Sequence, residues 1–195
     1  LYGLGTLAEA VLAFGFSAFF LRLWYLTGAM LTAAWLGQGT VHLLVRRRGV
    51  APALTAGLAV LSFLAAGLVF AAPLLSSAFD PAQPVSGQYR EILGRSGFTI
   101  FLTIFFNLYG TVGLIGGAAY SAWLFWRKQV LPDRMIGNLL IAAGALFPAM
   151  AGSLIRAGLV DWLYVSELAG AVLMFVGFVR ATAHQPVRKA ATAGA

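Results

Sequence analysis

Five long apolar runs constrain the fold of this chain more than any other feature of its sequence. They cover residues 17–45, 51–75, 97–126, 135–155 and 160–179 of the 195. A helix rises 1.5 Å per residue, so about 20 residues cross the roughly 30 Å hydrocarbon core of a bilayer. Each run reaches that length. The sequence therefore predicts an all-α, polytopic integral membrane helical bundle with five full spans.

Composition indicates the same class of protein. Hydrophobic residues make up 61% of the chain and charged residues 10%, against about 45–50% and about 25% in soluble domains. The chain has no cysteine, which excludes disulfides, thiolate metal sites and thiol catalysis. The net charge of +7 would suggest nucleic acid in a soluble protein. In a membrane chain it is better interpreted as a topology signal, so no nucleic-acid partner is expected.

A sixth apolar run, residues 1–14, is too short to span a bilayer. The chain opens inside it, without an initiator Met or a basic segment, so it is not typical of a signal peptide. We expect residues before Leu1 to complete this truncated span, which gives six helices. One further helix, which we favour, would make seven in the complete protein and place its N-terminus outside.

Basic residues predict the orientation, because Lys and Arg concentrate in cytoplasmic segments of membrane proteins. Alternating sides along the chain gives nine basic residues on the side of Arg46–Arg48 and four on the other. We therefore expect residues 1–183 to form the transmembrane bundle, with an ordered exterior loop at 76–96, and residues 184–195 to form a cytoplasmic tail. The predicted location is the cell (plasma) membrane, multi-pass, with a cytoplasmic C-terminus.

Four ionisable residues fall within the predicted outer leaflet, namely Glu9, Arg22, Arg156 and Glu167. Charged groups are costly inside a membrane and usually pair with one another or mark a functional site. Two carboxylates and two guanidinium groups can form a neutral cluster, and we expect the pairs Glu9–Arg22 and Arg156–Glu167, joined directly or through water. The cluster locks adjacent helices, lines a ligand pocket open to the exterior, or contacts a partner.

Small residues predict where helices approach closely. Gly110, Gly113 and Gly117 share one face of the 97–126 helix, and small residues let two backbones meet in lipid, where no hydrophobic drive holds helices together. We expect this helix-packing stripe to contact another helix of the chain, with a partner subunit as the alternative. Asn107, near mid-membrane on the same helix, is expected to hydrogen-bond to a neighbouring helix.

A second polar pattern places Trp35, Gln38 and His42 on one helix face, at i, i+3 and i+7. The imidazoles of His42 and His184 lie at similar predicted depth, and axial histidines are used by haem sites. Their surroundings do not favour ligation, so no cofactor and no metal site is predicted. A weak haem, chlorin or quinone contact at His42 and Gln38 stays open.

The sequence contains no catalytic motif, so we expect a protein that is not an enzyme. We favour a non-catalytic accessory or structural subunit of a larger membrane complex, whose partners are lipids and other membrane protein subunits. One alternative is a seven-helix sensor with an exterior pocket, since the layout generically resembles receptor-like sensory bundles. The second alternative is a small transporter, against which the lack of an inverted repeat counts.

Overall fold

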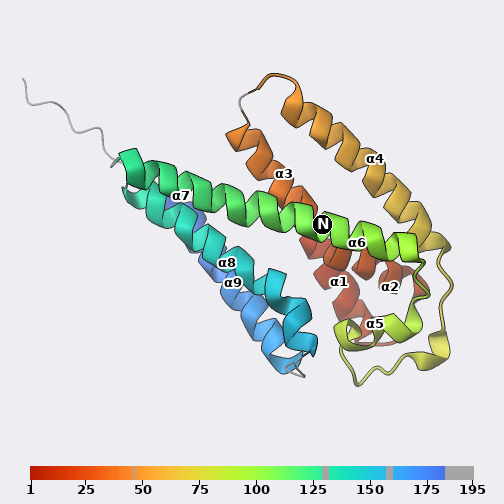
Figure 1. The fold of residues 1–195 in the computed structure, drawn as a ribbon. Helices are drawn as coiled ribbons and strands as arrows, with labels where there is room; N and C mark the ends of the chain where they lie inside the picture. The colour runs from red at the N-terminus through yellow and green to blue at the C-terminus, as the bar shows by residue number, and fades with distance from the viewer. Residues whose placement is uncertain (46, 129–131, 157–159, 183–195) are drawn as a thin grey trace, which may run out of the picture.

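The computed structural model of the chain describes residues 1–45, 47–128, 132–156 and 160–182, with side chains described except at 125, 128, 132, 134, 148–156, 160, 161, 163 and 164. These residues form helices and no strand (Figure 1), which confirms the all-α prediction. In order, the helices are α1 (Tyr2–Leu12), α2 (Ala18–Trp24), α3 (Thr32–Leu44), α4 (Val50–Ala71), α5 (Val85–Ile92), α6 (Gly97–Thr111), α7 (Gly117–Lys128), α8 (Pro132–Arg156) and α9 (Val160–Thr182).

Four helical stretches of the described chain are long and apolar enough to cross a membrane. They are Ala18–Leu44, Val50–Ala71, Gly97–Leu124 and Val165–Thr182. The first joins α2 to α3 and the third joins α6 to α7, so each is one continuous helical run. In α8 the described side chains end at Phe147, and the apolar stretch among them is Met135–Phe147. A helical membrane bundle is therefore consistent with the structure, which does not confirm the predicted five full spans.

A π-helical segment interrupts both continuous runs: η1 (Tyr25–Leu31) between α2 and α3, and η3 (Val112–Gly116) between α6 and α7. π-Helical turns shift the backbone hydrogen bonds by one residue and leave carbonyl groups in need of other partners. The Asn107 amide donates to the Ala29 carbonyl of η1 at 2.9 Å. The Thr32 hydroxyl donates to the Thr27 carbonyl at 2.6 Å. Asn107 thus joins two helices, as the sequence predicted.

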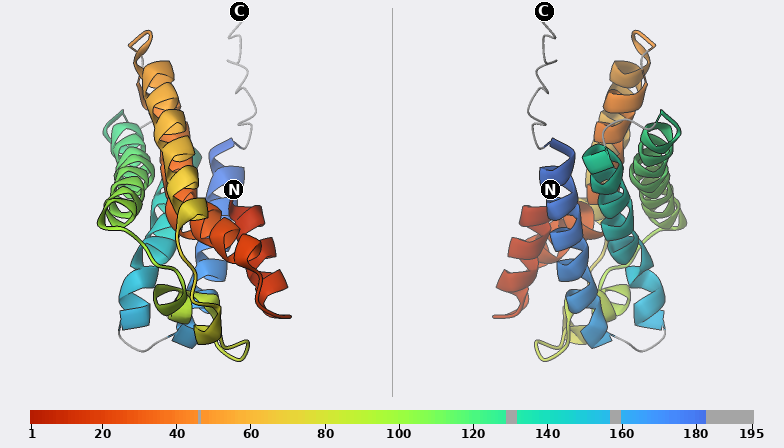
Figure 2. Two further views of the ribbon diagram at one scale, coloured as in Figure 1. Left: turned by 90° about the vertical axis from the view of Figure 1, so that its right-hand side faces the viewer. Right: turned by 90° about the vertical axis from the view of Figure 1, so that its left-hand side faces the viewer.

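The helices define two ends of the bundle, which we call the α5 end and the opposite end. The turn at Gly15, helix α5, the start of α6 and the end of α8 lie toward the α5 end (Figure 2). The turn at Arg47–Gly49, the end of α7 and the end of α9 lie at the opposite end. This alternation matches the order in which the predicted spans change sides.

Segment 76–96 holds a helix that the sequence did not predict. It begins with a short 3-10 turn, η2 (Ser76–Ala78), and contains α5. Its base is closed by backbone hydrogen bonds, from Leu75 N–H to the Ile92 carbonyl at 2.8 Å and from Gly94 N–H to the Pro73 carbonyl at 2.9 Å. The expected ordered loop is therefore a small closed lobe seated on the bundle.

Helices α8 and α9 form a hairpin of close backbone contact. A Cβ atom built on Gly177 would lie 2.6 Å from the Gly137 carbonyl oxygen, and one built on Gly144 would lie 2.6 Å from that of Gly170. No side chain fits between backbones at that separation. The main apolar core lies elsewhere, around fully buried Tyr25 and Phe106, and is formed by α1, α2, η1, α3, α4, α5 and α6.

Candidate functional site

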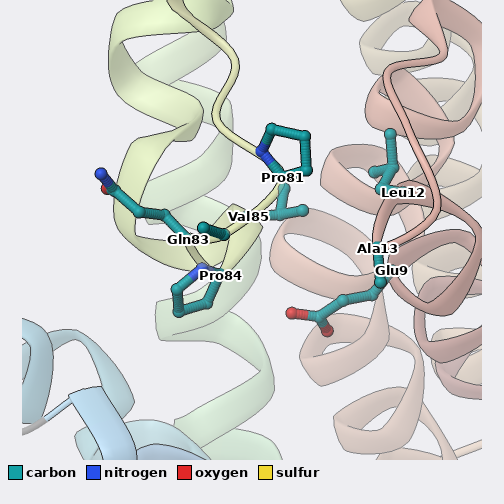
Figure 3. Close-up of a pocket in the computed structure, with 8 residues that line it drawn as sticks. Glu9, Leu12, Ala13, Pro81, Gln83, Pro84 and Val85 are labelled. Atoms are coloured by element: carbon teal, nitrogen blue, oxygen red, sulfur yellow. The ribbon is translucent and has the colours of Figure 1, made fainter.

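A cleft of about 180 Å³ lies at the α5 end, between the last turn of α1 and residues 81–85 (Figure 3). Its walls are mostly apolar, and Glu9 carries the one charge among the residues that line it. Those residues are Glu9, Leu12, Ala13, Pro81, Ala82, Gln83, Pro84 and Val85. Drug-sized ligands occupy pockets of about 300–1,000 Å³, so this cleft suits a smaller molecule.

The wall opposite α1 is built by hydrogen bonds around Asp80. The Asp80 carboxylate accepts from Ala82 N–H at 2.9 Å and from the Gln83 amide at 3.0 Å. The Gln88 side chain, 5% exposed, donates to the carbonyls of Asp80 and Gln83 at 2.8 and 2.7 Å. It also accepts from Asp80 N–H at 2.8 Å. Gln88 therefore pins the turn to α5, a role that the sequence did not indicate.

Glu9 is held on the α1 side of the cleft by an indole. Trp24 Nε1–H donates to Glu9 Oε2 at 3.3 Å, and the Glu9 side chain extends from α1 toward Pro84 (Figure 3). The Glu9 carboxylate also lies close enough to Glu167 of α9 for the two to interact electrostatically. The carboxylates of Glu9 and Glu167 both interact electrostatically with the Tyr2 hydroxyl. Two of the four predicted outer-leaflet residues, Glu9 and Glu167, therefore lie near enough to influence each other's charge.

A cluster of aromatic rings and one guanidinium group lies behind Trp24. The Tyr89 ring is 5.5 Å from the Trp24 ring and 5.6 Å from the Tyr25 ring, centroid to centroid. The Arg95 guanidinium lies 5.0 Å from the centre of the Tyr89 ring and 5.8 Å from that of Tyr25. A cation over a ring face is attracted to it, by about 0.5–1 kcal/mol at exposed sites. The cluster ties α5 to α2 and η1.

Arg22 faces α4 in the structure. Its Nη2 donates to the Ala72 carbonyl at 2.8 Å, just beyond the last turn of α4, where helix carbonyls lack partners along the helix. The described side chains of Glu9 and Arg22 form no direct ion pair, and a pairing of the two through water stays a prediction. The Arg156 side chain lies outside the described residues, and so does its expected pairing with Glu167.

The predicted glycine stripe of α6, η3 and α7 faces α3. A Cβ on Gly110 would lie 2.1 Å from the backbone carbon of Ala33, and one on Gly113 would lie 3.1 Å from Gly37 Cα. A Cβ on Gly117 would meet the Thr40 methyl group at 2.1 Å. The structure therefore places this stripe in a contact within the chain.

The face of α3 that carries Trp35, Gln38 and His42 forms a polar seam with α4. Trp35 Nε1–H donates to Ser62 Oγ at 3.2 Å. Gln38 Nε2 donates to the Ala51 carbonyl at 3.1 Å and to Thr55 Oγ1 at 2.8 Å. The His42 Nε2 atom lies 2.7 Å from Thr55 Oγ1.

The hydroxyl of Tyr109, from α6, donates to Gln38 Oε1 and completes this seam. Gln38 is 2% exposed, and both N–H bonds of its amide are used within the protein. A cofactor contact at Gln38 would have to displace one of them. His42 is exposed, whereas the second histidine considered for a haem, His184, lies outside the described residues.

Among the side chains that the structure describes, no three His, Cys, Asp or Glu residues gather in a group that could hold a metal ion. Comparison of the chain with protein-family models, with curated proteins and with solved structures finds no match. The site is therefore defined by its geometry alone, and its most distinctive part is the cleft beside Glu9.

Proposed function

We propose that this chain is a non-catalytic membrane protein that binds a small ligand in the cleft at its α5 end. The observation that carries the proposal is the position of Glu9, a carboxylate in a mostly apolar wall, held by the Trp24 indole at 3.3 Å. Pockets of this kind, apolar with a few placed polar groups, are the usual form of small-molecule sites. This corresponds to the sensor alternative of the sequence analysis.

The packing of α1 supports a sensing role. Helix α1 contributes one wall of the cleft and rests on η1 through glycines, since a Cβ on Gly5 would lie 2.9 Å from Gly28 Cα. Contact this close transmits a displacement of one backbone to the other, because protein interiors have little free volume. A ligand that moves α1 would therefore act on η1 and, through Asn107 and Ala29, on α6.

The accessory-subunit role favoured by the sequence fits this proposal if the chain is the ligand-binding subunit of a larger complex. Its docking surface would then lie elsewhere than on the glycine stripe, which contacts α3. Lipids and other membrane subunits remain the proposed partners.

In the membrane we propose five spans, with α8 as the fifth, and the α5 end facing the cell exterior. The turn between α3 and α4 and the ends of α7 and α9 then face the cytoplasm, and α5 faces the exterior. The cytoplasmic segments hold Arg47, Arg48, Arg127 and Arg180, in keeping with the positive-inside rule. Because the chain has no cysteine, single cysteines at positions 47 and 83 test this. An impermeant thiol reagent should label position 83 but not 47 in intact cells.

Ligand binding itself is tested by filling the cleft. Ala13 lines the cleft and is exposed, so Ala13→Trp should occupy the cleft and leave the fold intact. Purified wild-type and variant proteins are equilibrated with a small-molecule extract, washed, and analysed by mass spectrometry. We expect compounds retained by the wild type and lost from the variant, at equal thermal stability. Identical retained sets would refute the proposal.

A further inference from the structure

We infer that the opposite end of the bundle binds the headgroups of anionic phospholipids, at the corner where the end of α7 and the start of α8 meet the end of α9. This corner is separate from the cleft at the α5 end. Its binding of lipid does not depend on the ligand proposed for that cleft.

Charge is distributed unevenly between the two ends. The sequence around the α3–α4 turn, the α7–α8 junction and the end of α9 (residues 36–60, 115–140 and 175–195) contains nine basic residues and one acidic residue, Asp133. The rest of the chain contains four basic and five acidic residues. One carboxylate neutralises one positive charge, whichever cations share it, so these three stretches carry a net charge of +8 against −1 for the rest.

The ends of three helices bring part of this charge together. The start of α8 lies against the end of α9, since a Cβ on Gly137 would lie 2.6 Å from the Ala181 nitrogen. Arg180 Nε donates to Asp133 Oδ1 at 3.3 Å. A guanidinium group has five N–H donors, so Arg180 can hold Asp133 and a phosphate at the same time. Helix α7 packs against α8 and ends one residue after the exposed Arg127.

Aromatic rings of α7 form the apolar part of the same surface. Tyr120, Trp123 and Trp126 are exposed, and the Arg127 guanidinium lies 5.5 Å from the centre of the Trp123 ring. Trp and Tyr rings are enriched at the level of lipid headgroups in membrane proteins. Arg127 is therefore at the depth of the lipid phosphates, with the Trp rings beside the first carbons of the acyl chains.

This depth favours a lipid over a soluble polyanion such as RNA or an acidic protein segment. The membrane-length runs end at Leu124 in α7 and at Thr182 in α9, so Arg127 and Arg180 each lie within three residues of such an end. In the orientation proposed above, this end faces the cytoplasmic leaflet, which holds the anionic lipids of a plasma membrane. Each Lys or Arg near that surface contributes about 1 kcal/mol to the attraction.

Tryptophan fluorescence reports which lipid lies beside each end of the bundle, because bromine atoms on a lipid chain quench the rings they touch. Trp126 of α7 and Trp162 near the start of α9 are both exposed, at opposite ends (Figure 2). The full chain is placed in neutral detergent micelles with brominated phosphatidylglycerol or brominated phosphatidylcholine. Trp126→Phe and Trp162→Phe variants separate the two signals. We expect half-maximal quenching of Trp126 at a roughly fivefold lower fraction of phosphatidylglycerol, the equivalent of about 1 kcal/mol, and no such preference at Trp162.

Substitutions identify the cations responsible. Arg127→Gln and Arg180→Gln should each reduce the preference of Trp126 for phosphatidylglycerol, and Arg127→Lys should retain it because the charge remains. Arg90→Gln is the matched control, since Arg90 is an exposed arginine of α5, and it should leave the preference unchanged. Added salt should weaken the preference, because exposed charges are screened.

Four results would overturn the inference. Equal quenching of Trp126 by the two lipids would show that headgroup charge is not recognised, and an equal preference at Trp162 would show that it is not recognised at this end. A preference that survives both glutamine substitutions would exclude the corner of α7, α8 and α9. Its loss on adding polyglutamate, at the same charge concentration as the lipid, would identify a soluble polyanion as the better ligand. Retention of small molecules by the cleft is measured separately with Ala13→Trp, so the proposed function does not depend on any of these results.

Discussion

Helix α3 is held in two different ways on its two faces. On one face its glycine backbone meets α6, and a Cβ built on Gly37 would lie 2.8 Å from Gly110 Cα. On the other face its side chains reach α4 through hydrogen bonds, from Trp35 to Ser62 and from Gln38 to Thr55. Both contacts lie within the hydrocarbon-length part of the chain, so the same helix shows both means of association available in lipid.

The two contacts differ in how much change they tolerate. Close glycine packing depends on shape, and any added atom must displace a backbone. A hydrogen-bonded seam holds helices farther apart, and interhelical bonds in membranes contribute about 0.6 kcal/mol each on average. We therefore expect the α3–α6 contact to be the rigid part of the fold, and the α3–α4 contact to be adjustable except at its buried centre.

The largest expected effect is at the rigid contact. Gly110→Leu should lower the unfolding free energy by about 3 kcal/mol or more, because a Cβ there would lie 2.1 Å from a backbone atom of Ala33. Overpacking alone costs about 1–3 kcal/mol. The measurement is the unfolding free energy in mixed micelles. Gly116→Leu is the matched control, because nothing lies within 4 Å of a Cβ on Gly116. Equal losses for both variants would refute the rigid-contact interpretation.

The next largest effect is at the buried centre of the polar seam. Gln38→Leu keeps the volume but removes the amide, which leaves the Tyr109 hydroxyl without its partner and Thr55 with one bond fewer. Leaving a buried polar group unsatisfied costs about 1–3 kcal/mol.

Combining Tyr109→Phe with Gln38→Leu tests whether the two side chains stabilise the fold as a pair. The double variant should lose less stability than the sum of the single losses, because it removes both members of the pair. Additive losses would show that the two side chains are not coupled.

The sequence predicted the helical class and the ends of the long helices well. Lengths of apolar runs decide helix ends in a membrane, so the runs 17–45 and 51–75 lie close to Ala18–Leu44 and Val50–Ala71. Helix α5 was missed, because Val85, Gln88 and Ile92 bury one face of a single short helix in a segment rich in Pro and Gly. The signal was present as i, i+3, i+7 spacing, but two turns are too few for a clear period.

The site was predicted less completely than the fold. The sequence singled out Glu9 because a carboxylate is rare in an apolar helix, but it assigned Arg22 as the partner. The structure adds Trp24, two residues further along the same helix, as a donor to Glu9, and the predicted pairing with Arg22, directly or through water, stays a prediction. Which neighbour reaches a side chain depends on helix rotation, and apolar runs do not encode rotation. The cleft wall at 81–85 depends on the bonds of Gln88 and Asp80, which lie outside any predicted helix.

A smaller effect is expected at the periphery of the seam. Trp35→Phe keeps an aromatic ring and removes the Nε1–H that reaches Ser62 at 3.2 Å. The unfolding free energy should therefore fall by about 0.6 kcal/mol, the average for an interhelical hydrogen bond in a membrane. Ser62→Ala is the partner variant, and the Ser62 hydroxyl also donates to the Leu58 carbonyl of its own helix at 2.7 Å. A loss above about 2 kcal/mol in either variant would mean that the seam is as rigid as the glycine contact.

The smallest effect is expected at the α8–α9 hairpin, where a charge contact and a glycine contact join the same two helices. Arg180 Nε lies 3.3 Å from Asp133 Oδ1, with side chains 47% and 42% exposed. Exposed ion pairs contribute little, so the coupling energy between Asp133→Asn and Arg180→Gln in a double-mutant cycle should be below about 0.5 kcal/mol. Gly137→Leu on the same helices should cost several times more, because a Cβ there would lie 2.6 Å from the Gly177 carbonyl oxygen and from the Ala181 nitrogen. If the ion pair instead contributed as much as the glycine contact, electrostatics would hold this hairpin together, and the distinction drawn for α3 would not extend to the rest of the bundle.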